Sequence, residues 1–277
     1  MKKIVTLVLV LAMVLSMVAS FTSCGGIDPA EDWKTIEERG YFVCGITDYA
    51  PMNFKDDKGE WTGFDTDFAK AVAEHLGVEV RFFELGDWNQ KYVELDSGNI
   101  DMIWNGFTFG DESDGKSRTE YVDFTHAYLE NRQCLVFKTD KLGQFTTKES
   151  LAGATAVVEG SSSGEGVAKE LVGDKGKVVT KSAQSAALME LKAGLADFAV
   201  IDYQMAVAMV GTGDYTDLSM STVYEPESEV YAIGCRKGSS LTAKINEAIK
   251  ALSDNGTLAD IAEKYDLTND LIKNIGE

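Results

Sequence analysis

The sequence predicts an α/β protein of two similar lobes, and three observations carry that prediction. Short apolar runs alternate with amphipathic helical patterns, which is typical of βα units around a mostly parallel sheet. The length of 277 residues fits about two domains of roughly 150 residues each. Residues 94–101 and 190–197 share one pattern: the end of a helix, a glycine, and an aspartate before an apolar strand. We therefore expect two α/β lobes.

The first residues indicate a targeting segment. Lys2 and Lys3 precede an apolar run over residues 4–18, interrupted only by Thr6 and Ser16. A membrane-spanning helix needs about 20 apolar residues, so this run is too short to span and predicts a signal peptide over residues 1–23.

The next part of the chain predicts three strands and two helices. The expected strands cover residues 41–46, 78–83 and 100–104. Residues 65–67 supply N-cap candidates for a helix that stops at Gly77. Asp87 can cap a second helix, which ends near Gly98.

The second half repeats this order. The expected strands cover residues 154–158, 178–179 and 198–201, and the helices between them residues 165–171 and 182–192. Residues 138–150 and 222–228 are candidate connections between the two sets. Residues 241–252 carry a helical apolar stripe, and a last helix begins at Thr257.

Composition and charge exclude several classes of protein. A hydrophobic content of 44% suffices for a large core and argues against disorder. The net charge of −19 makes nucleic acid a poor partner, because such proteins need a basic footprint. Cys44, Cys134 and Cys235 lie in apolar runs and are expected to be buried, reduced thiols. The two histidines are isolated, so we expect no metal site and no cofactor.

The loops that follow the expected strands place the candidate binding site. Ligands of open parallel sheets bind beyond the carboxyl ends of the strands. These loops are residues 47–51, 105–108 and 159–164 and the residue Asp202. They contain hydroxyls, carboxylates, glycines and aromatic rings, so together they could hold a small zwitterion.

Several segments, in order, resemble the polar amino-acid-binding proteins of ABC importers. Residues 45–69 resemble the opening signature of that family, and residues 98–101, Arg118 and residues 123–128 resemble its G-x-x-D … R … F-S-x-x-Y run. Cys24, preceded by Thr22 and Ser23, resembles the lipidation site of bacterial lipoproteins.

The resemblance implies a two-lobed clamp of the periplasmic-binding-protein type, joined by two hinge segments. Lobe 1 would comprise residues 36–131 and 229–277, lobe 2 residues 132–228, and residues 24–35 a linker to the lipid on Cys24. The implied protein is an extracytoplasmic monomer, periplasmic or anchored to the outer face of the cell membrane. Its implied partners are a free amino acid and the permease subunits of an ABC transporter.

The resemblance also implies roles for single residues. Arg118 matches the arginine that grips the ligand's α-carboxylate, and Asp202 the acid that receives its α-ammonium. Donors and acceptors around the carboxylate would come from Thr108, the backbone of Gly106, and Ser161 or Ser162. The aromatic walls flanking the ligand side chain would be Tyr49 and Trp88.

Other functions stay open at this point. Members of the family that bind lysine or arginine often carry an acid at the position of Ile46, so the sequence does not support a cationic ligand. Asp48 and Glu159 lie near the expected site, so a cationic ligand is not ruled out either. An enzyme of the cyclohexadienyl dehydratase type would need a poised carboxylate, for which Glu159 is the candidate. The third alternative is a stand-alone sensor. We expect a non-enzyme, because no Ser-His-Asp or Cys-His set is apparent.

Overall fold

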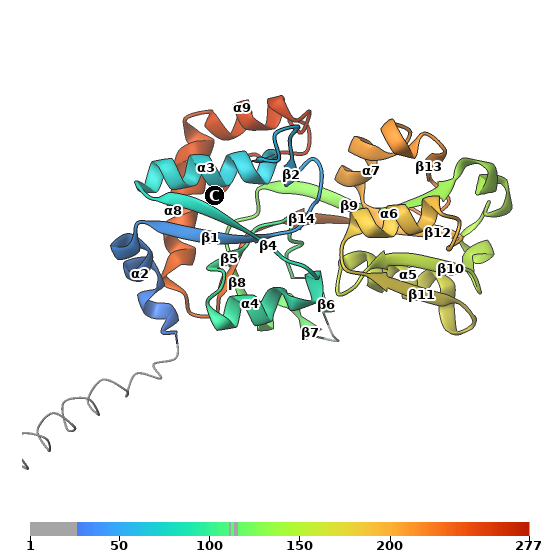
Figure 1. The fold of residues 1–277 in the computed structure, drawn as a ribbon, viewed down its shortest axis with the longest axis horizontal. Coiled ribbons are helices and arrows are strands. Elements are labelled where there is room, and N and C mark those ends of the chain that lie inside the picture. Colours follow the sequence, from blue (N-terminus) through green and yellow to red (C-terminus); the bar gives the residue numbers. More distant parts are fainter. Residues whose placement is uncertain (1–26, 111, 114–115, 277) are drawn as a thin grey trace, which may run out of the picture.

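The computed structural model describes residues 27–110, 112–113 and 116–276. Two lobes lie side by side, each with a sheet between helices (Figure 1). The expected signal peptide and Cys24 lie outside the described residues. The fold begins earlier than predicted: Pro29–Glu31 form a 3₁₀ turn and α2 (Asp32–Arg39) follows, so much of the expected linker belongs to lobe 1.

The sheet of lobe 1 has the strand order β4-β1-β5-β15-β8. Its strands are β1 (Tyr41–Ile46), β4 (Glu79–Glu84), β5 (Met102–Ile103), β8 (Val122–Phe124) and β15 (Gly234–Arg236). β1 runs parallel to β4 and β5, whereas β15 runs antiparallel to β5 and β8. The sheet is therefore mixed. Its antiparallel strand, β15, joins the sheet after the chain has returned from lobe 2.

Helices cover both faces of this sheet. Phe42 and Cys44 pack into a cluster with α3 (Phe64–Leu76), α8 (Ser240–Asp254) and α9 (Thr257–Lys264), while Val43 faces the cluster that includes α4 (Lys91–Ser97). Alternate residues of a strand point to opposite faces, so a strand covered on both sides is apolar throughout.

The sheet of lobe 2 has the order β11-β10-β12-β9-β13. Its strands are β9 (Leu129–Lys138), β10 (Thr155–Glu159), β11 (Lys177–Lys181), β12 (Phe198–Asp202) and β13 (Leu218–Ser221). Its helices are α5 (Ser163–Val172), α6 (Gln184–Lys192) and α7 (Tyr203–Met209). β10 is parallel to β11 and β12, and β9 is antiparallel to β12 and β13.

Two strands connect the lobes. β9 pairs with β14 (Ser228–Tyr231) through its first residues and with β12 through its later ones. Leu129 also bridges to Leu271, so a segment near the end of the chain lies against the same crossing. Two short hairpins project from lobe 1: β2 (Phe54–Lys55) with β3 (Trp61–Thr62), and β6 (Glu112–Ser113) with β7 (Lys116–Ser117).

The sequence repeat corresponds to a repeated structural device. Asp101, before β5, accepts a hydrogen bond from the amide of Val43 in β1 at 2.7 Å. Asp197, before β12, accepts one from the amide of Thr155 in β10 at 2.8 Å. Each aspartate ties the start of its strand to the first parallel strand of its lobe. The prediction of two related βα units is confirmed.

The cap expected for α3 is wrong. The N-cap is Gly63, with φ 121°, and it makes no side-chain cap bond. A Cβ at this position would meet the carbonyl oxygen of Met52 at 2.2 Å, so the close approach of the preceding loop requires glycine. Asp65 lies instead in the first turn, where its buried carboxylate bonds to other parts of the lobe.

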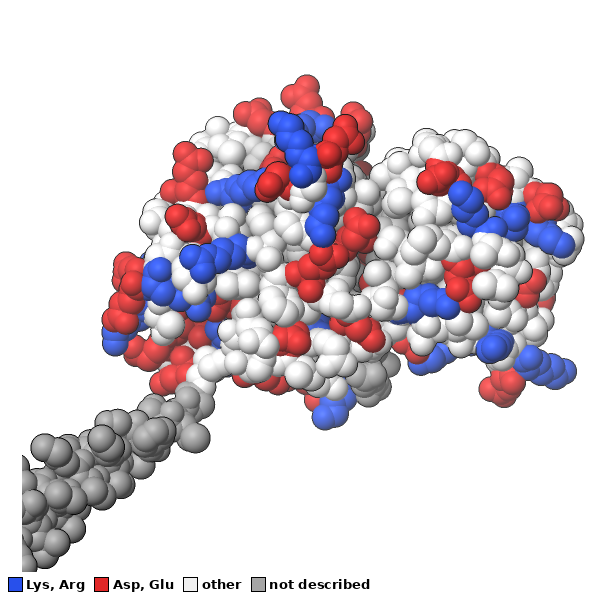
Figure 2. Space-filling model, in the orientation of Figure 1, with Lys and Arg blue, Asp and Glu red and all other residues white. Residues whose placement is uncertain are grey.

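The surface and the cysteines agree with the composition. Acidic and basic side chains are interspersed on the face drawn in Figure 2. Cys44, Cys134 and Cys235 are buried and unpaired. Within the described part of the chain, none of the helices combines the length and apolar character needed to cross a bilayer.

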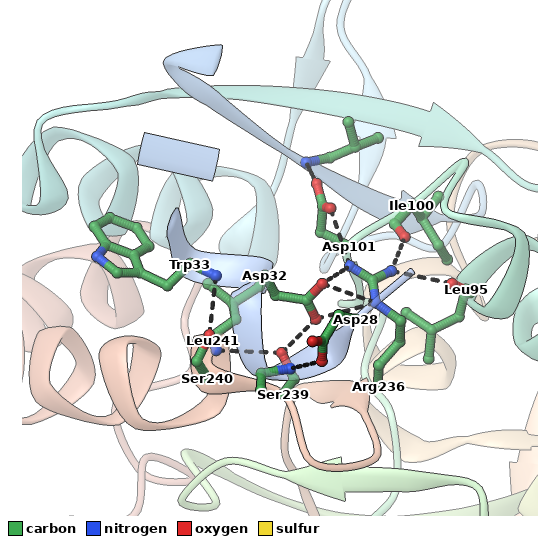
Figure 3. A network of polar contacts seen from close by, with 12 residues as sticks. Asp28, Asp32, Trp33, Leu95, Ile100, Asp101, Arg236, Ser239, Ser240 and Leu241 are labelled. Atoms are coloured by element: carbon green, nitrogen blue, oxygen red, sulfur yellow. Dashed lines mark hydrogen bonds and ion pairs between the residues drawn. The ribbon is translucent and has the colours of Figure 1, made fainter. Parts of the chain in front are cut away.

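A buried ion network joins α2 to the sheet of lobe 1 (Figure 3). Arg236 on β15 donates to both carboxylate oxygens of Asp32, at 2.8 Å and 3.0 Å, and to the carbonyls of Leu95 and Ile100. It also bonds to Asp101 at 3.3 Å. The guanidinium of Arg236 thus pairs with two carboxylates, that of Asp32 at the start of α2 and that of Asp101 just before β5.

We expect the substitution Arg236→Met to reduce the free energy of unfolding by about 3–5 kcal/mol, because it leaves the buried carboxylate of Asp32 without its cation. Urea unfolding at pH 7 measures this. Lys250→Met breaks an exposed ion pair with Asp254 and serves as the control. Equal losses in the two variants would contradict a structural role for the network.

Candidate functional site

A narrow pocket of about 10 Å³ lies between the lobes. Lobe 1 contributes Trp88, Asn105, Gly106, Thr108 and Arg118, and lobe 2 contributes Glu159, Ser162, Ser163, Gln184 and Asp202. Six of the eight predicted site residues therefore line one pocket: Trp88, Gly106, Thr108, Arg118, Ser162 and Asp202. Tyr49 and Ser161 are not among its lining residues.

Arg118 supplies a buried positive charge, with 2% of its surface exposed. It follows the β6–β7 hairpin and begins a short 3₁₀ helix. Its Nη atoms donate to the carbonyls of Thr108, at 3.1 Å, and Ser161, at 3.2 Å, while its Nε has no partner. Among the described residues, no carboxylate lies within ion-pair distance of this guanidinium. The charge is held in place by neutral acceptors.

Asp202 supplies a buried negative charge from the other lobe. It ends β12, and its carboxylate accepts hydrogen bonds from Gln133 Nε2 at 2.5 Å and Gln184 Nε2 at 2.7 Å. The backbone amide of Asp202 donates to the Oε1 of Gln184 at 2.8 Å. Neutral amides therefore fix this carboxylate without neutralising it.

Two glutamates lie close to Asp202. Burial and, to a smaller extent, the charge of Asp202 raise the pKa of Glu159 from 4.5 to about 8, against the opposing charges of Lys91 and Arg118. Burial and Asp202 also raise the pKa of Glu229 to about 7. Three carboxyl groups thus share the cleft, and their mutual repulsion favours proton or cation uptake there.

The loop after β5 is positioned from behind. Gly106 has φ 54°, and its amide donates to the carboxylate of Asp65 at 2.7 Å. A Cβ on Gly106 would lie 2.6 Å from the Tyr49 ring and 3.0 Å from the Tyr231 ring. Tyr49 thus packs behind this glycine, with its hydroxyl 2.5 Å from that of Tyr231.

Trp88 both lines the pocket and joins the lobes. Its ring stands edge-on to Phe107, and its indole Nε1 is buried without a partner. Its backbone amide donates to the carbonyl of Ser182 in lobe 2 at 3.0 Å. The ring is therefore held at the interface of the lobes as well as in the core of lobe 1.

The three serines after β10 have different environments. Ser161 has φ 54° and its hydroxyl donates to Asn89 of lobe 1 at 2.7 Å. Ser162 caps α5, accepting from the amide of Glu165 and donating to the carbonyl of Glu159. Ser163 is buried and its hydroxyl has no partner. The serine with an unused hydroxyl is the one that sequence reasoning did not select.

Sequence reasoning also missed Asn105, Gln133, Gln184 and Glu229 as site residues. Asn105 directly follows an expected strand, so its position was available as a signal. The other three come from the start of α6 and from the two crossing strands, where no local pattern marks them. Within the described residues, no group of three or more His, Cys, Asp or Glu could hold a metal ion.

Comparison with known proteins gives consistent matches. The arginine-binding extracellular protein ArtP of Bacillus subtilis is 29% identical, over 89% of this chain and 92% of its own length. The L-cystine-binding protein TcyJ of Escherichia coli K12 is 30% identical, over 83% of this chain and 84% of its own.

Solved structures agree with these relatives. A substrate-binding protein of an ABC uptake transporter from Streptococcus pneumoniae, with bound histidine, superposes with a TM-score of 0.74. It is 32% identical, and the match covers 85% of this chain and 96% of that one. The family model for the bacterial extracellular solute-binding proteins, family 3, matches residues 42–268. This chain therefore belongs to the bacterial extracellular solute-binding proteins of family 3.

Proposed function

We propose that the protein captures a free amino acid between its lobes, as the solute-binding component of an amino-acid ABC importer. One observation carries the proposal. Arg118 and Asp202 come from opposite lobes, carry opposite charges and line one pocket, and each is bonded to neutral groups. Buried charges are costly unless an opposite charge meets them, and a zwitterion supplies one for each.

The proposed contacts follow from this polarity. The guanidinium of Arg118 offers parallel donors to an α-carboxylate, and Thr108 and the serine loop lie at the same end. The α-ammonium would face Asp202, and Trp88 would flank the side chain, with Tyr49 supporting the loop of Gly106. Binding from both lobes would stabilise the closed form over any open one.

The cellular location and the partner of the protein are inferred from its family and from its N-terminal sequence. Cys24 would carry a lipid that holds a monomeric receptor on the outer face of the membrane, close to its permease. Mass spectrometry of the purified N-terminus tests the lipid. Co-purification with membrane permease subunits tests the partner, and light scattering tests the monomer.

We expect Arg118→Met and Asp202→Asn each to weaken amino-acid binding at least about tenfold, because each leaves one ligand charge unpaired in a desolvated site. Isothermal titration calorimetry first screens the twenty amino acids with the native protein. The same titration is then repeated with each variant, using whichever ligand bound.

Matched controls are Arg81→Met and Asp217→Asn. Asp217 lies outside the pocket, in a partly exposed ion pair with Lys138. Arg81 lies on β4, the edge strand of lobe 1, and its guanidinium stacks on the ring of Tyr41 in the neighbouring strand β1. Both control variants should bind as the native protein does. Silence across the whole amino-acid panel, or unchanged binding in both site variants, would refute the proposed function.

Glu159 favours a second candidate, an enzyme that dehydrates cyclic carboxylic acids. With a pKa of about 8 its carboxyl is protonated at neutral pH, so it could donate a proton to a leaving hydroxyl. Prephenate incubated with the native protein and with Glu159→Gln tests this by absorbance. We expect no consumption in either; turnover that depends on Glu159 would replace the transport function.

The raised pKa values also predict a pH dependence of stability. In the unfolded chain Glu159 and Glu229 lose their protons near pH 4.5, whereas in the fold they keep them until about pH 8 and pH 7. Folding therefore takes up protons, and the melting temperature of the ligand-free protein should fall as pH rises from 5 to 8.

Glu159→Gln combined with Glu229→Gln should flatten that decline, because amides do not titrate. Circular dichroism melts at pH 5, 6, 7 and 8 measure it. Glu74→Gln, at an exposed position on α3, should leave the slope unchanged. A double variant with the native slope would show that these carboxyls are not protonated in the fold.

A further inference from the structure

A second and larger cavity adjoins the pocket between the lobes. It measures about 830 Å³ and shares Thr108 and Ser163 with the inner pocket. Its wall includes Phe109 from lobe 1, Val167 and Glu170 from α5, and Tyr224 with residues 226–230 at and before the crossing strand β14. The inner pocket therefore adjoins a cavity that has room for a group longer than an α-amino-acid backbone.

The wall of this outer cavity is acidic. Among its described lining residues are Glu170, Glu227 and Glu229, and neither a lysine nor an arginine is present. Glu170 is paired with Lys148 at 2.7 Å, on the solvent side. Glu229 lies deeper in the outer cavity and accepts a hydrogen bond from Thr108, which lines both cavities.

Glu229 is held by neutral donors. Its Oε1 accepts hydrogen bonds from Asn131 at 2.5 Å, Gln133 at 2.9 Å and Thr108 at 3.1 Å. The same Gln133 amide nitrogen also donates to Asp202, so two carboxylates share one donor. Such an arrangement orients both anions but does not balance their charges. The hydrogen-bond partners of Glu229 among the described residues include neither lysine nor arginine, although the charge of Arg118 acts on it from a greater distance, as it does on Glu159.

Ser163 gives an independent indication of a ligand at this junction. The residue is 8% exposed, lines both cavities, and its hydroxyl has no hydrogen-bond partner in the structure. Buried hydroxyls are normally satisfied, so a polar group passing this point would meet an available partner.

We propose that the ligand is a basic amino acid whose side chain leaves the inner pocket past Ser163 and places its cationic end against Glu229. The inference rests on the proposed function, because Arg118 and Asp202 would hold the α-carboxylate and α-ammonium. A guanidinium or ammonium at Glu229 balances the charge left over there and occupies the acidic cavity. With a neutral side chain of the same length, that carboxyl must either keep a proton or remain an uncompensated anion.

Calorimetry with L-arginine, L-lysine and L-citrulline tests the proposal. Citrulline matches the length of arginine but carries a neutral ureido group. The native protein should bind arginine or lysine at least about tenfold more tightly than citrulline. In Glu229→Gln that preference should fall below about threefold, because the cationic end of the ligand loses its partner.

Glu74→Gln removes the same charge at a distance from both cavities and should retain the native preference. Equal binding of arginine and citrulline by the native protein would overturn the proposal without any variant. A preference that persists in a folded Glu229→Gln protein would overturn the assignment of Glu229. Binding of neutral amino acids alone would leave the proposed function intact and refute this inference, whereas no binding of any amino acid would refute both.

Discussion

The negative charge of Asp202, held inside the cleft by two glutamine amides, is the constraint on which its surroundings depend. It contributes to the raised pKa values of Glu159 and Glu229, and of the tyrosine pair Tyr49 and Tyr231 behind the pocket. Neutral donors orient the carboxylate but leave its field in place. The cleft therefore favours cations around Asp202, whereas the buried guanidinium of Arg118 favours an anionic group.

The fold makes this charge arrangement possible by bringing together strand ends from two sheets. Asp101 and Asp197 tie equivalent strands to the first strand of each lobe, so the loops that follow begin from comparable positions. Contacts between the lobes then close the pocket: Trp88 bonds to Ser182, and Ser161 to Asn89. Arg118, proposed to hold the ligand, also donates from lobe 1 to the carbonyl of Ser161 in lobe 2, so closure and recognition share this guanidinium.

Much of this was accessible from the sequence, because strands buried on both faces are continuous apolar runs and the loops after them are easily located. That logic located Asp202 and the loop of Gly106, whereas Arg118 came from the resemblance to the family. It did not select Ser163, the one of the three serines whose hydroxyl has no partner; Ser161 takes a left-handed turn position and bonds to Asn89, and Ser162 caps α5. It missed Gln133, Gln184 and Glu229 because their role arises only when the crossing strands and the second lobe meet. The α3 cap failed for a related reason: the close approach of Met52 selects Gly63, whereas propensity favours the aspartates.

Lobe 2 is a single uninterrupted excursion of the chain between β9 and β14, and it contains Asp202, Glu159, Gln184 and the serine loop, while Arg118 remains with lobe 1. Recombination at the two crossing strands would replace Asp202, Glu159 and Gln184 together, as part of lobe 2, and would retain Arg118 in lobe 1. Ligand preference and the grip on the α-carboxylate could then diverge independently in evolution. The crossing strands β9 and β14 are also the positions at which lobe 2 of another protein could be joined to this lobe 1.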